Sequence, residues 1–399
     1  MRCYFLWRNV RRNTYRVNFF VFPFLHIMPE PLKEMFNRSA IKAISELVQV
    51  AYPVFDATSF RRMATTGLAD LELLPRAKHI AVALHRHLPS DVPSALDIIV
   101  RALPKPPNAE ESQEFSSFIY MPFTIYVAEH GLPHFNEAMK ANYELTQRFT
   151  AEFSIRPYLM HHQERTLETL HQWATDPSHH VRRLVSEGTR PRLPWATRLP
   201  EFQKNPKPVL ALLEKLKDDP SLYVRRSVAN NLNDIGKDNP DVLFSTAKKW
   251  LKGASTNREW VVKHALRSSI KRGEQGAFAV LGYDKPPSVK INNSNIDPAT
   301  PRIDGNVCVT FTVKNTSKLT ENLLIDLSVH FVKSNGSTNA KVFKLTTAQL
   351  APGEHIDLRK TISLKQHTTR THYPGVHRVE VLVNGKPCEC GEFTLSAQG

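Results

Sequence analysis

The sequence has too few cysteines for a disulfide framework. Only Cys3, Cys308, Cys388 and Cys390 occur among 399 residues, and they form no C-x-x-C pair and no spacing typical of zinc. No run reaches the roughly 18 apolar residues that a membrane helix needs. Walker, G-x-G-x-x-G and G-x-S-x-G motifs are also missing. These absences argue against a membrane helix and nucleotide-driven chemistry, and they predict a cytoplasmic protein with neither metal nor cofactor.

Positive charge is abundant but unevenly distributed. The formal net charge is +15, and residues 151–285 hold 23 basic against 15 acidic residues. Residues 28–150, in contrast, hold 12 basic against 14 acidic residues. Basic charge concentrated in one segment is typical of a protein that binds a polyanion, usually a nucleic acid. A generally basic surface without such a partner is the alternative that charge alone leaves open.

Residues 1–27 differ from the rest of the chain. They hold five Arg and no acid, and their apolar run from Val17 to Ile27 is interrupted by Pro23. The run lacks the small residues of a signal-peptidase site. We expect residues 1–27 to be a disordered or artefactual extension, with the biological start at Met28. A basic arm for targeting or for a membrane surface is the alternative.

Residues 28–285 show the periodicity of helices. Apolar residues recur at helical spacing in 80–88, 95–103, 115–127 and 135–149. A repeat follows, because D-P-S-H-H-V-R-R at 176–183 matches D-P-S-L-Y-V-R-R at 219–226, and W-V-V-K at 260–263 is a weaker copy. Repeats of about 37–47 residues with two helices each are typical of HEAT-like proteins. The sequence therefore predicts an all-α HEAT-like repeat solenoid over residues 28–285.

The repeat unit predicts a row of cations on one concave face. Val181 and Val224 are expected to pack inward, while the basic residues after them project from the same surface of successive repeats. This row consists of Arg182, Arg183, Arg225, Arg226, Lys263, Arg267 and Lys271, and neighbouring segments add Arg156, Arg190 and Arg192 as candidate DNA-binding residues. The alternative is that each arginine pairs with a local carboxylate, as Arg183 could with Glu187 four residues later.

Beyond the proline-containing linker at 284–287, the periodicity changes to two. Val307, Val309, Phe311 and Val313 alternate with polar residues, and similar alternation occurs within 325–331, 356–364 and 376–383. Asn384-Gly385 is typical of a hairpin turn. About seven short strands over roughly 110 residues predict a small all-β immunoglobulin-like sandwich. We expect it to occupy residues 286–399.

Three acids are candidates for chemistry, and two of them stand where a negative charge is unusual. Asp234 and Glu187 each come shortly before a glycine, and both are expected in the last turn of a helix. The helix dipole disfavours a negative charge there by about 0.3–1 kcal/mol. Glu152 is expected at a joint between two helices. Each acid also has an ordinary explanation as a salt bridge, in which the partners are Lys237 for Asp234, Arg183 for Glu187 and Arg156 for Glu152.

Trp195 lies after a proline in the basic loop R-P-R-L-P-W at 190–195. Its ring could stack on a nucleic-acid base or cover the core of the repeats, and the sequence leaves both possibilities open. An aromatic face beside carboxylates would attract a cationic ligand. The histidines at 161–162 and 179–180 lack the H-E-x-x-H spacing of a metal site.

Three segments together resemble the AlkC family of bacterial HEAT-like DNA glycosylases. They are EFSIRPY at 152–158, DPSHHVRRLVSEGTRPRLPW at 176–195 and DDPSLYVRRSVANNLNDIGKDNPD at 218–241. The similarity covers about residues 28–285. Some members of the family also carry a C-terminal immunoglobulin-like domain, which matches the sandwich expected here.

The resemblance implies an enzyme that hydrolyses the N-glycosidic bond of 3-methyladenine in double-stranded DNA, without a cofactor and without strand cleavage. It implies that Asp234 and Glu152 are catalytic carboxylates that stabilise an oxocarbenium-like sugar, and that Glu187, the third predicted catalytic acid, lies with Trp195 in the same pocket. It also implies that the sandwich helps to encircle the duplex. We expect a monomer that acts on nucleoid DNA in the cytoplasm. The competing hypotheses are a non-catalytic HEAT-repeat scaffold for nucleic acid or an acidic protein, and an RNA-binding or RNA-modifying protein.

Overall fold

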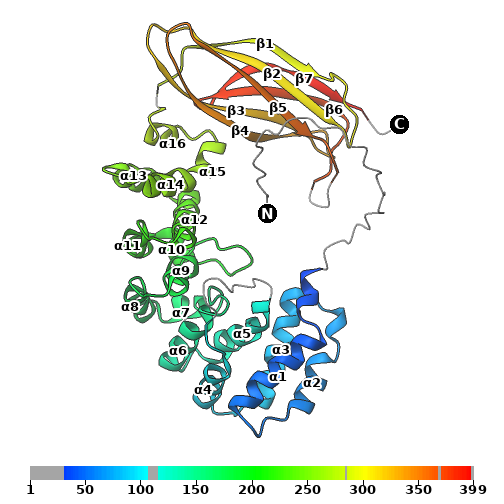
Figure 1. Cartoon of the computed structure of the whole chain (residues 1–399), viewed down its shortest axis with the longest axis vertical. Coiled ribbons are helices and arrows are strands. Elements are labelled where there is room, and N and C mark those ends of the chain that lie inside the picture. The colour runs from blue at the N-terminus through cyan, green and yellow to red at the C-terminus, as the bar shows by residue number, and fades with distance from the viewer. Residues whose placement is uncertain (1–30, 107–115, 284, 367–369, 397–399) are drawn as a thin grey trace, which may run out of the picture.

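The chain has the shape of an open ring (Figure 1). A curved stack of helices forms one side, and a β-sandwich at its end extends over the concave side of the stack. The computed structural model describes residues 31–106, 116–283, 285–366 and 370–396. The extension predicted at residues 1–27 lies outside these residues. Among the described helices, none combines the length and the apolar character needed to cross a membrane.

The first six α-helices confirm the helical periodicity of the sequence. They are α1 (Arg38–Ala51), α2 (Ala57–Thr65), α3 (Leu73–His87), α4 (Val92–Ala102), α5 (Met121–His130) and α6 (Phe135–Thr146). Side chains of Asn37, Asp56 and Asp91 each accept a hydrogen bond from a backbone amide in the first turn of α1, α2 and α4. These caps satisfy amides that have no partner within the helix.

The following helices form the repeats. They are α7 (Arg156–His161), α8 (Gln163–Trp173), α9 (His179–Gly188), α10 (Pro200–Lys204), α11 (Lys207–Leu216), α12 (Leu222–Asp238), α13 (Pro240–Leu251), α14 (Thr256–Ala265), α15 (Arg267–Lys271) and α16 (Gln275–Val280). Helices α9, α12 and α14 pack in sequence along the inner side of the curve, and α8, α11 and α13 lie outside them (Figure 1). Val181, Val224 and Val261 are fully buried at equivalent positions. The predicted HEAT-like solenoid is therefore confirmed.

Gly236 corrects one detail of the sequence analysis. The sequence predicts that Gly236 ends the helix after Asp234, but α12 continues to Asp238 and contains Gly236. The reason for the glycine is close packing, because a Cβ atom at this position would lie 2.3 Å from Leu243 Cδ2 of α13.

We expect Gly236→Ala to lower the free energy of unfolding by about 1–3 kcal/mol, because an added methyl group forces Leu243 out of its place. This loss opposes the roughly 1 kcal/mol by which alanine favours a helix over glycine. Urea denaturation measures the difference. Gly253→Asn is the control, since a Cβ atom there has nothing within 4 Å and the φ of 61° suits asparagine. An unchanged stability of Gly236→Ala would contradict the close approach.

Two antiparallel sheets form the C-terminal part. One contains β1 (Val289–Asp297), β2 (Asn306–Asn315) and β5 (His355–Ser363), in that order. The other has the order β4-β3-β6-β7 and contains β3 (Glu321–Val332), β4 (Thr338–Leu350), β6 (Gly375–Val383) and β7 (Lys386–Leu395). Asn384 and Gly385 have positive φ and connect β6 to β7, as the hairpin motif predicts. The immunoglobulin-like sandwich of about seven strands is confirmed.

The sandwich packs against the last helix of the repeats. A Cβ atom on Gly385 would lie 2.5 Å from Phe278 Cε2, so the turn between β6 and β7 rests on the ring of α16. Burial raises the pKa of Asp326 in β3, and nearby Lys344 and Lys271 oppose this shift. Lys271, predicted to bind DNA, therefore lies at the junction with the sandwich as well as on the surface.

Candidate active site

A loop at 189–199 joins α9 to α10, and the buried side chain of Arg156 fixes it in place. The Arg156 guanidinium donates to the carbonyls of Gly188 at 3.0 Å, Arg190 at 2.9 Å and Thr197 at 2.8 Å. Arg156 is only 2% exposed, and burial lowers its pKa to about 10. The prediction that Arg156 reaches DNA phosphates is therefore corrected. Its donors are used on the backbone of the loop.

Trp195 stands at the tip of this loop. Trp195 is 76% exposed, and its φ of 63° lies in the left-handed region. That conformation is unfavourable for a bulky residue, so the surrounding contacts must hold it. In the same loop, the Arg192 Nε donates to Asp238 of α12 at 2.7 Å, which fixes the loop to that helix. Of the two possibilities that the sequence leaves open for Trp195, covering the core is excluded by its exposure.

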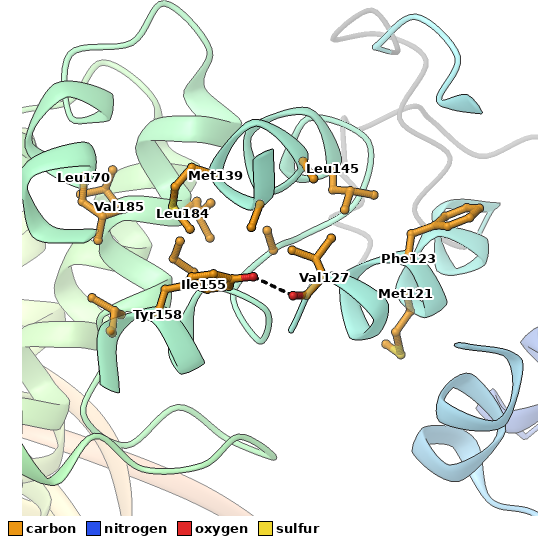
Figure 2. Packing of buried hydrophobic residues seen from close by; sticks show 14 of the residues in the cluster. Met121, Phe123, Val127, Met139, Leu145, Ile155, Tyr158, Leu170, Leu184 and Val185 are labelled. Atoms are coloured by element: carbon orange, nitrogen blue, oxygen red, sulfur yellow. Dashed lines mark hydrogen bonds between the residues drawn. The ribbon is translucent and has the colours of Figure 1, made fainter. Parts of the chain in front are cut away.

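Glu152 lies in the joint between α6 and α7, as the sequence predicts. Ile155 and Tyr158, which follow it, are fully buried and pack among the apolar side chains of the neighbouring helices (Figure 2). The Tyr158 hydroxyl donates to the Val127 carbonyl at 2.7 Å, which ties this segment to α5 (Figure 2). These contacts give Glu152 a rigid base from which its carboxylate reaches toward α9.

Five charged side chains form a continuous carboxylate–arginine chain. Arg183 lies 2.6 Å from Glu152 and 3.6 Å from Glu187. Arg190 lies 2.6 Å from Glu187 and 2.7 Å from Asp234. The structure thus brings together the three carboxylates predicted to be catalytic, through two arginines that the sequence analysis assigned to DNA binding.

The three carboxylates differ in accessibility. The Glu152 side chain is 14% exposed, that of Glu187 is 7% and that of Asp234 is 2%. Arg190 binds one oxygen of Asp234, and Lys237 binds the other at 2.8 Å. The salt bridge between Asp234 and Lys237, which the sequence offered as the ordinary explanation, is therefore also present. Glu152 is the acid that solvent or a ligand reaches most easily.

Glu187 is charged despite its burial. Burial alone raises the pKa of a carboxyl group, but Arg183 and Arg190 beside it, together with a hydrogen bond from Ser227, lower the pKa of Glu187 below its ordinary value. The Ser227 hydroxyl donates to Glu187 Oε2 at 2.5 Å. Glu187 is therefore ionised at neutral pH.

A cleft of about 350 Å³, here called the first cleft, opens beside this chain. Glu152, Glu187 and Arg190 line it, and Trp195 forms one wall. Much of the remaining wall is apolar, and the volume is within the range of about 300–1,000 Å³ typical of small-molecule sites. A flat aromatic ring, apolar walls and net negative charge suit a cationic planar ligand. Asp234 lies behind Arg190 and is not part of the wall.

The two arginines of each repeat have different roles, which corrects the predicted row of cations. Arg182 donates to the carbonyls of Asp176 and Pro177, and Arg225 donates in the same way to Asp219 and Pro220. Both also reach the next repeat, where Arg182 pairs with Asp219 at 2.6 Å and Arg225 binds Asn257. The first arginine therefore connects consecutive repeats and does not project as a free cation.

The second basic position of the repeats is the more accessible one. Arg226 and Lys263 are exposed there, whereas Arg183 belongs to the carboxylate–arginine chain. Arg267 is half-buried and donates to Asn230, while Lys271 is exposed. The cations open to a large anion are thus fewer than the sequence predicts.

Two histidines on these helices are held neutral. Burial lowers the pKa of His180 to about 4, with His179 and Arg183 adding to the effect. Burial likewise lowers the pKa of His264 to about 4, together with Arg267 and Arg226. We expect stability to fall as the pH decreases from about 6.5 to about 4, because the unfolded chain takes up these protons before the folded chain does.

Thermal unfolding across this pH range checks that expectation. The double variant His180→Gln, His264→Gln is expected to lose stability less steeply between these pH values than the unchanged chain. His355→Gln, at an exposed position of β5, serves as the control and is expected to keep the original slope. Identical slopes for all three proteins would contradict the neutral state of the two buried rings.

Two residues of the site, Thr150 and Ser227, are not indicated by the sequence. The Thr150 hydroxyl donates to Glu152 Oε2 at 2.8 Å and lies 2.9 Å from the Arg183 guanidinium. Ser227 binds Glu187, as described above. Thr150 lies outside the motifs and Ser227 inside the segment 218–241, but the roles of both become visible only when α9 and α12 are packed against the joint after α6. Within the part of the chain that the structure describes, no three or more His, Cys, Asp or Glu side chains are arranged to hold a metal ion.

Comparisons with known proteins agree with this architecture. Residues 138–268 match the family described as DNA alkylation repair enzyme, and residues 290–397 match the C-terminal Ig-like domain of the uncharacterised protein YhaZ. The chain is 36% identical over 367 residues to YhaZ of Bacillus subtilis strain 168, covering 91% of this chain and 99% of YhaZ.

A solved structure is similar over nearly the whole chain. It is the alkylpurine DNA glycosylase AlkC of Pseudomonas fluorescens, bound to DNA containing an abasic site analog. The TM-score is 0.85 at 38% sequence identity, and the match covers 92% of this chain and 100% of that chain. Helical repeats, sandwich and relatives together show that this chain belongs to the AlkC-like family of DNA alkylation repair enzymes.

Proposed function

We propose that this chain is an alkylpurine DNA glycosylase that removes 3-methyladenine from duplex DNA. The observation that carries the proposal is the carboxylate–arginine chain on the wall of the first cleft, beside the exposed ring of Trp195. The AlkC relative holds DNA with an abasic site analog. An abasic site is what remains when a glycosylase has removed a base.

The chemistry requires negative charge more than a proton donor. A 3-alkylated adenine in DNA is already cationic, so it leaves as a neutral base once the N-glycosidic bond breaks. Positive charge then develops on the sugar, and carboxylates nearby stabilise it. We assign this role first to Glu152, because it lines the cleft and is the most accessible of the three acids.

Asp234 is the second proposed catalytic carboxylate. In the free chain it is closed off by Arg190 and Lys237. The Lys237 side chain is 39% exposed, and a DNA phosphate competes for its ammonium group. Withdrawal of Lys237 would release one oxygen of Asp234 toward the sugar. Glu187 keeps Arg183 and Arg190 aligned between the two acids.

Selection of the damaged base follows from its charge. The ring of Trp195 attracts a cationic purine more strongly than a neutral one, by about 0.5–2 kcal/mol. The acids of the first cleft add to this preference. Arg226, Lys263, Arg267 and Lys271 supply the phosphate contacts, and the sandwich extends over the concave side where it can help to surround a duplex (Figure 1). The proposed enzyme acts as a monomer.

The test is release of free base from a duplex oligonucleotide that carries one 3-methyladenine. Chromatography should detect the free base, and the strand should break only after alkaline treatment. DNA binding without base release would favour the non-catalytic scaffold. Strand cleavage without alkali would contradict hydrolysis as the only reaction.

A further inference from the structure

A second cleft adjoins the first on the other side of Trp195. Its volume is about 370 Å³, nearly that of the first cleft, at about 350 Å³. Leu74, Met121, Phe153 and Trp195 belong to both walls. The two clefts thus offer similar volume to a small planar molecule, and Trp195 on the exposed loop is one of the residues between them.

The outer wall of the second cleft is formed by α5 and α7. Ala128 of α5 and Met160 of α7 line it without touching the first cleft. The Met160 residue is 43% exposed, and Leu74 is 39% exposed. Exposed apolar side chains around a cleft of this size are typical of a binding site for a small apolar or aromatic molecule.

The two clefts differ in charge. Among the charged residues that line the first cleft, Glu152 and Glu187 outnumber Arg190, while Arg183, which pairs with both acids, is not part of the wall. The second cleft has the opposite balance, because Lys78 and Arg156 accompany a single acid, Glu129. Lys78 and Glu129 pair at 2.9 Å. A cation is therefore favoured in the first cleft and disfavoured in the second.

Base excision changes the charge of the base in the same direction. While the alkylated purine is attached to the sugar, it carries one positive charge. When the N-glycosidic bond breaks, both bonding electrons stay with the purine, which becomes neutral. Water adds to the sugar carbon and loses a proton to solvent. The free base thus loses its electrostatic attraction to the first cleft at the moment of release.

We infer that the second cleft binds the neutral purine base released by the reaction, which moves past Trp195 from the first cleft. This inference rests on the proposed glycosylase function. The ligand class is a free, uncharged N-alkylpurine. Lys78 and Glu129 at the rim offer a donor and an acceptor for its polar edge.

Calorimetric titration of the full chain with two matched probes tests the inference. The probes are free 3-methyladenine, which is neutral, and the 3,9-dimethyladeninium cation, which represents the base before release. Ala128→Phe and Met160→Trp fill the second cleft, and each is expected to weaken binding of the neutral probe by about tenfold or more. Glu152→Gln should leave that affinity unchanged and should weaken binding of the cation.

Val82→Phe is the control for a bulky substitution. Val82 is 38% exposed on α3 and lines neither cleft, so the variant should bind both probes as the unchanged chain does. Met160→Trp changes an exposed residue, which protects the test against loss of folding at Ala128. Thermal melting of each variant verifies the fold.

Two results would overturn the inference. One is failure of the unchanged chain to bind free 3-methyladenine, and the other is loss of that binding in Glu152→Gln but not in Ala128→Phe or Met160→Trp. Base release from alkylated DNA is measured in the same preparation. Release without binding of the free base overturns this inference alone, whereas binding without release overturns the proposed function.

Discussion

Replacing Glu152 by Gln is expected to lower the rate of base excision by about 10²- to 10³-fold, the effect typical of removing one preorganised electrostatic group. The amide has nearly the same size and can still accept from Thr150, so the joint between α6 and α7 should keep its structure. DNA affinity should change only a few-fold, because the proposed phosphate contacts lie elsewhere. Single-turnover release measures the rate, and fluorescence anisotropy measures the affinity.

Glu144→Gln is the matched control for this substitution. Glu144, on α6, also pairs with an arginine, Arg148, but it does not line either cleft. The control should excise the base at the unchanged rate. A full rate in Glu152→Gln would remove Glu152 from the reaction. A much larger loss in Asp234→Asn than in Glu152→Gln would identify Asp234 as the acid nearest the sugar.

The fold could be predicted from the sequence because it depends on the periodicity of apolar residues. Helical and strand spacing of apolar residues predicted both parts, and the repeated D-P-S-x-x-V-R-R unit indicated that Val181 and Val224 occupy equivalent buried positions. Gly236 was misplaced, because a glycine that allows close packing and a glycine that ends a helix look the same in the sequence. The contact with Leu243, on the next helix, decides between them.

Only part of the site could be predicted from the sequence. Local spacing suggests that Glu152 pairs with Arg156, four residues away, but the structure pairs it with Arg183. Packing of α9 against the joint after α6 brings these residues together, and no local pattern records that packing. The different roles of Arg182 and Arg183 could not be predicted from the sequence either. Adjacent arginines on one helix look alike in sequence, although one binds backbone carbonyls and the other binds carboxylates.

Replacing Arg190 by Met is expected to lower the free energy of unfolding by about 3–5 kcal/mol, the typical effect of removing one partner from a buried ion pair. Arg190 is 8% exposed and holds both Glu187 and Asp234. Without it, two buried carboxylates lose a shared cation. Urea denaturation at neutral pH measures the loss. Arg198→Met, at an exposed position of the same loop, is the control and should change stability little.

Arg190→Lys should recover little of this loss. Lysine offers one compact ammonium group, whereas the guanidinium donates in fixed directions to two separate acids. The loss caused by Arg190→Met should also shrink as the pH falls below about 4.3, where carboxyl groups in an unfolded chain become protonated. A loss that stays constant down to pH 3 would contradict its electrostatic origin.

A triple replacement separates the contribution of these charges to stability from their contribution to activity. Buried ion pairs replaced together by apolar residues of similar size often leave stability unchanged or raise it by about 1–4 kcal/mol. Glu187→Met, Arg190→Met and Asp234→Leu combined should therefore be more stable than Arg190→Met alone, yet inactive in base excision. Such a result would show that the buried charges of this chain serve the reaction, since the fold does not need them. A triple variant even less stable than Arg190→Met would instead show that the ion pairs hold α9, α12 and the loop of Trp195 together.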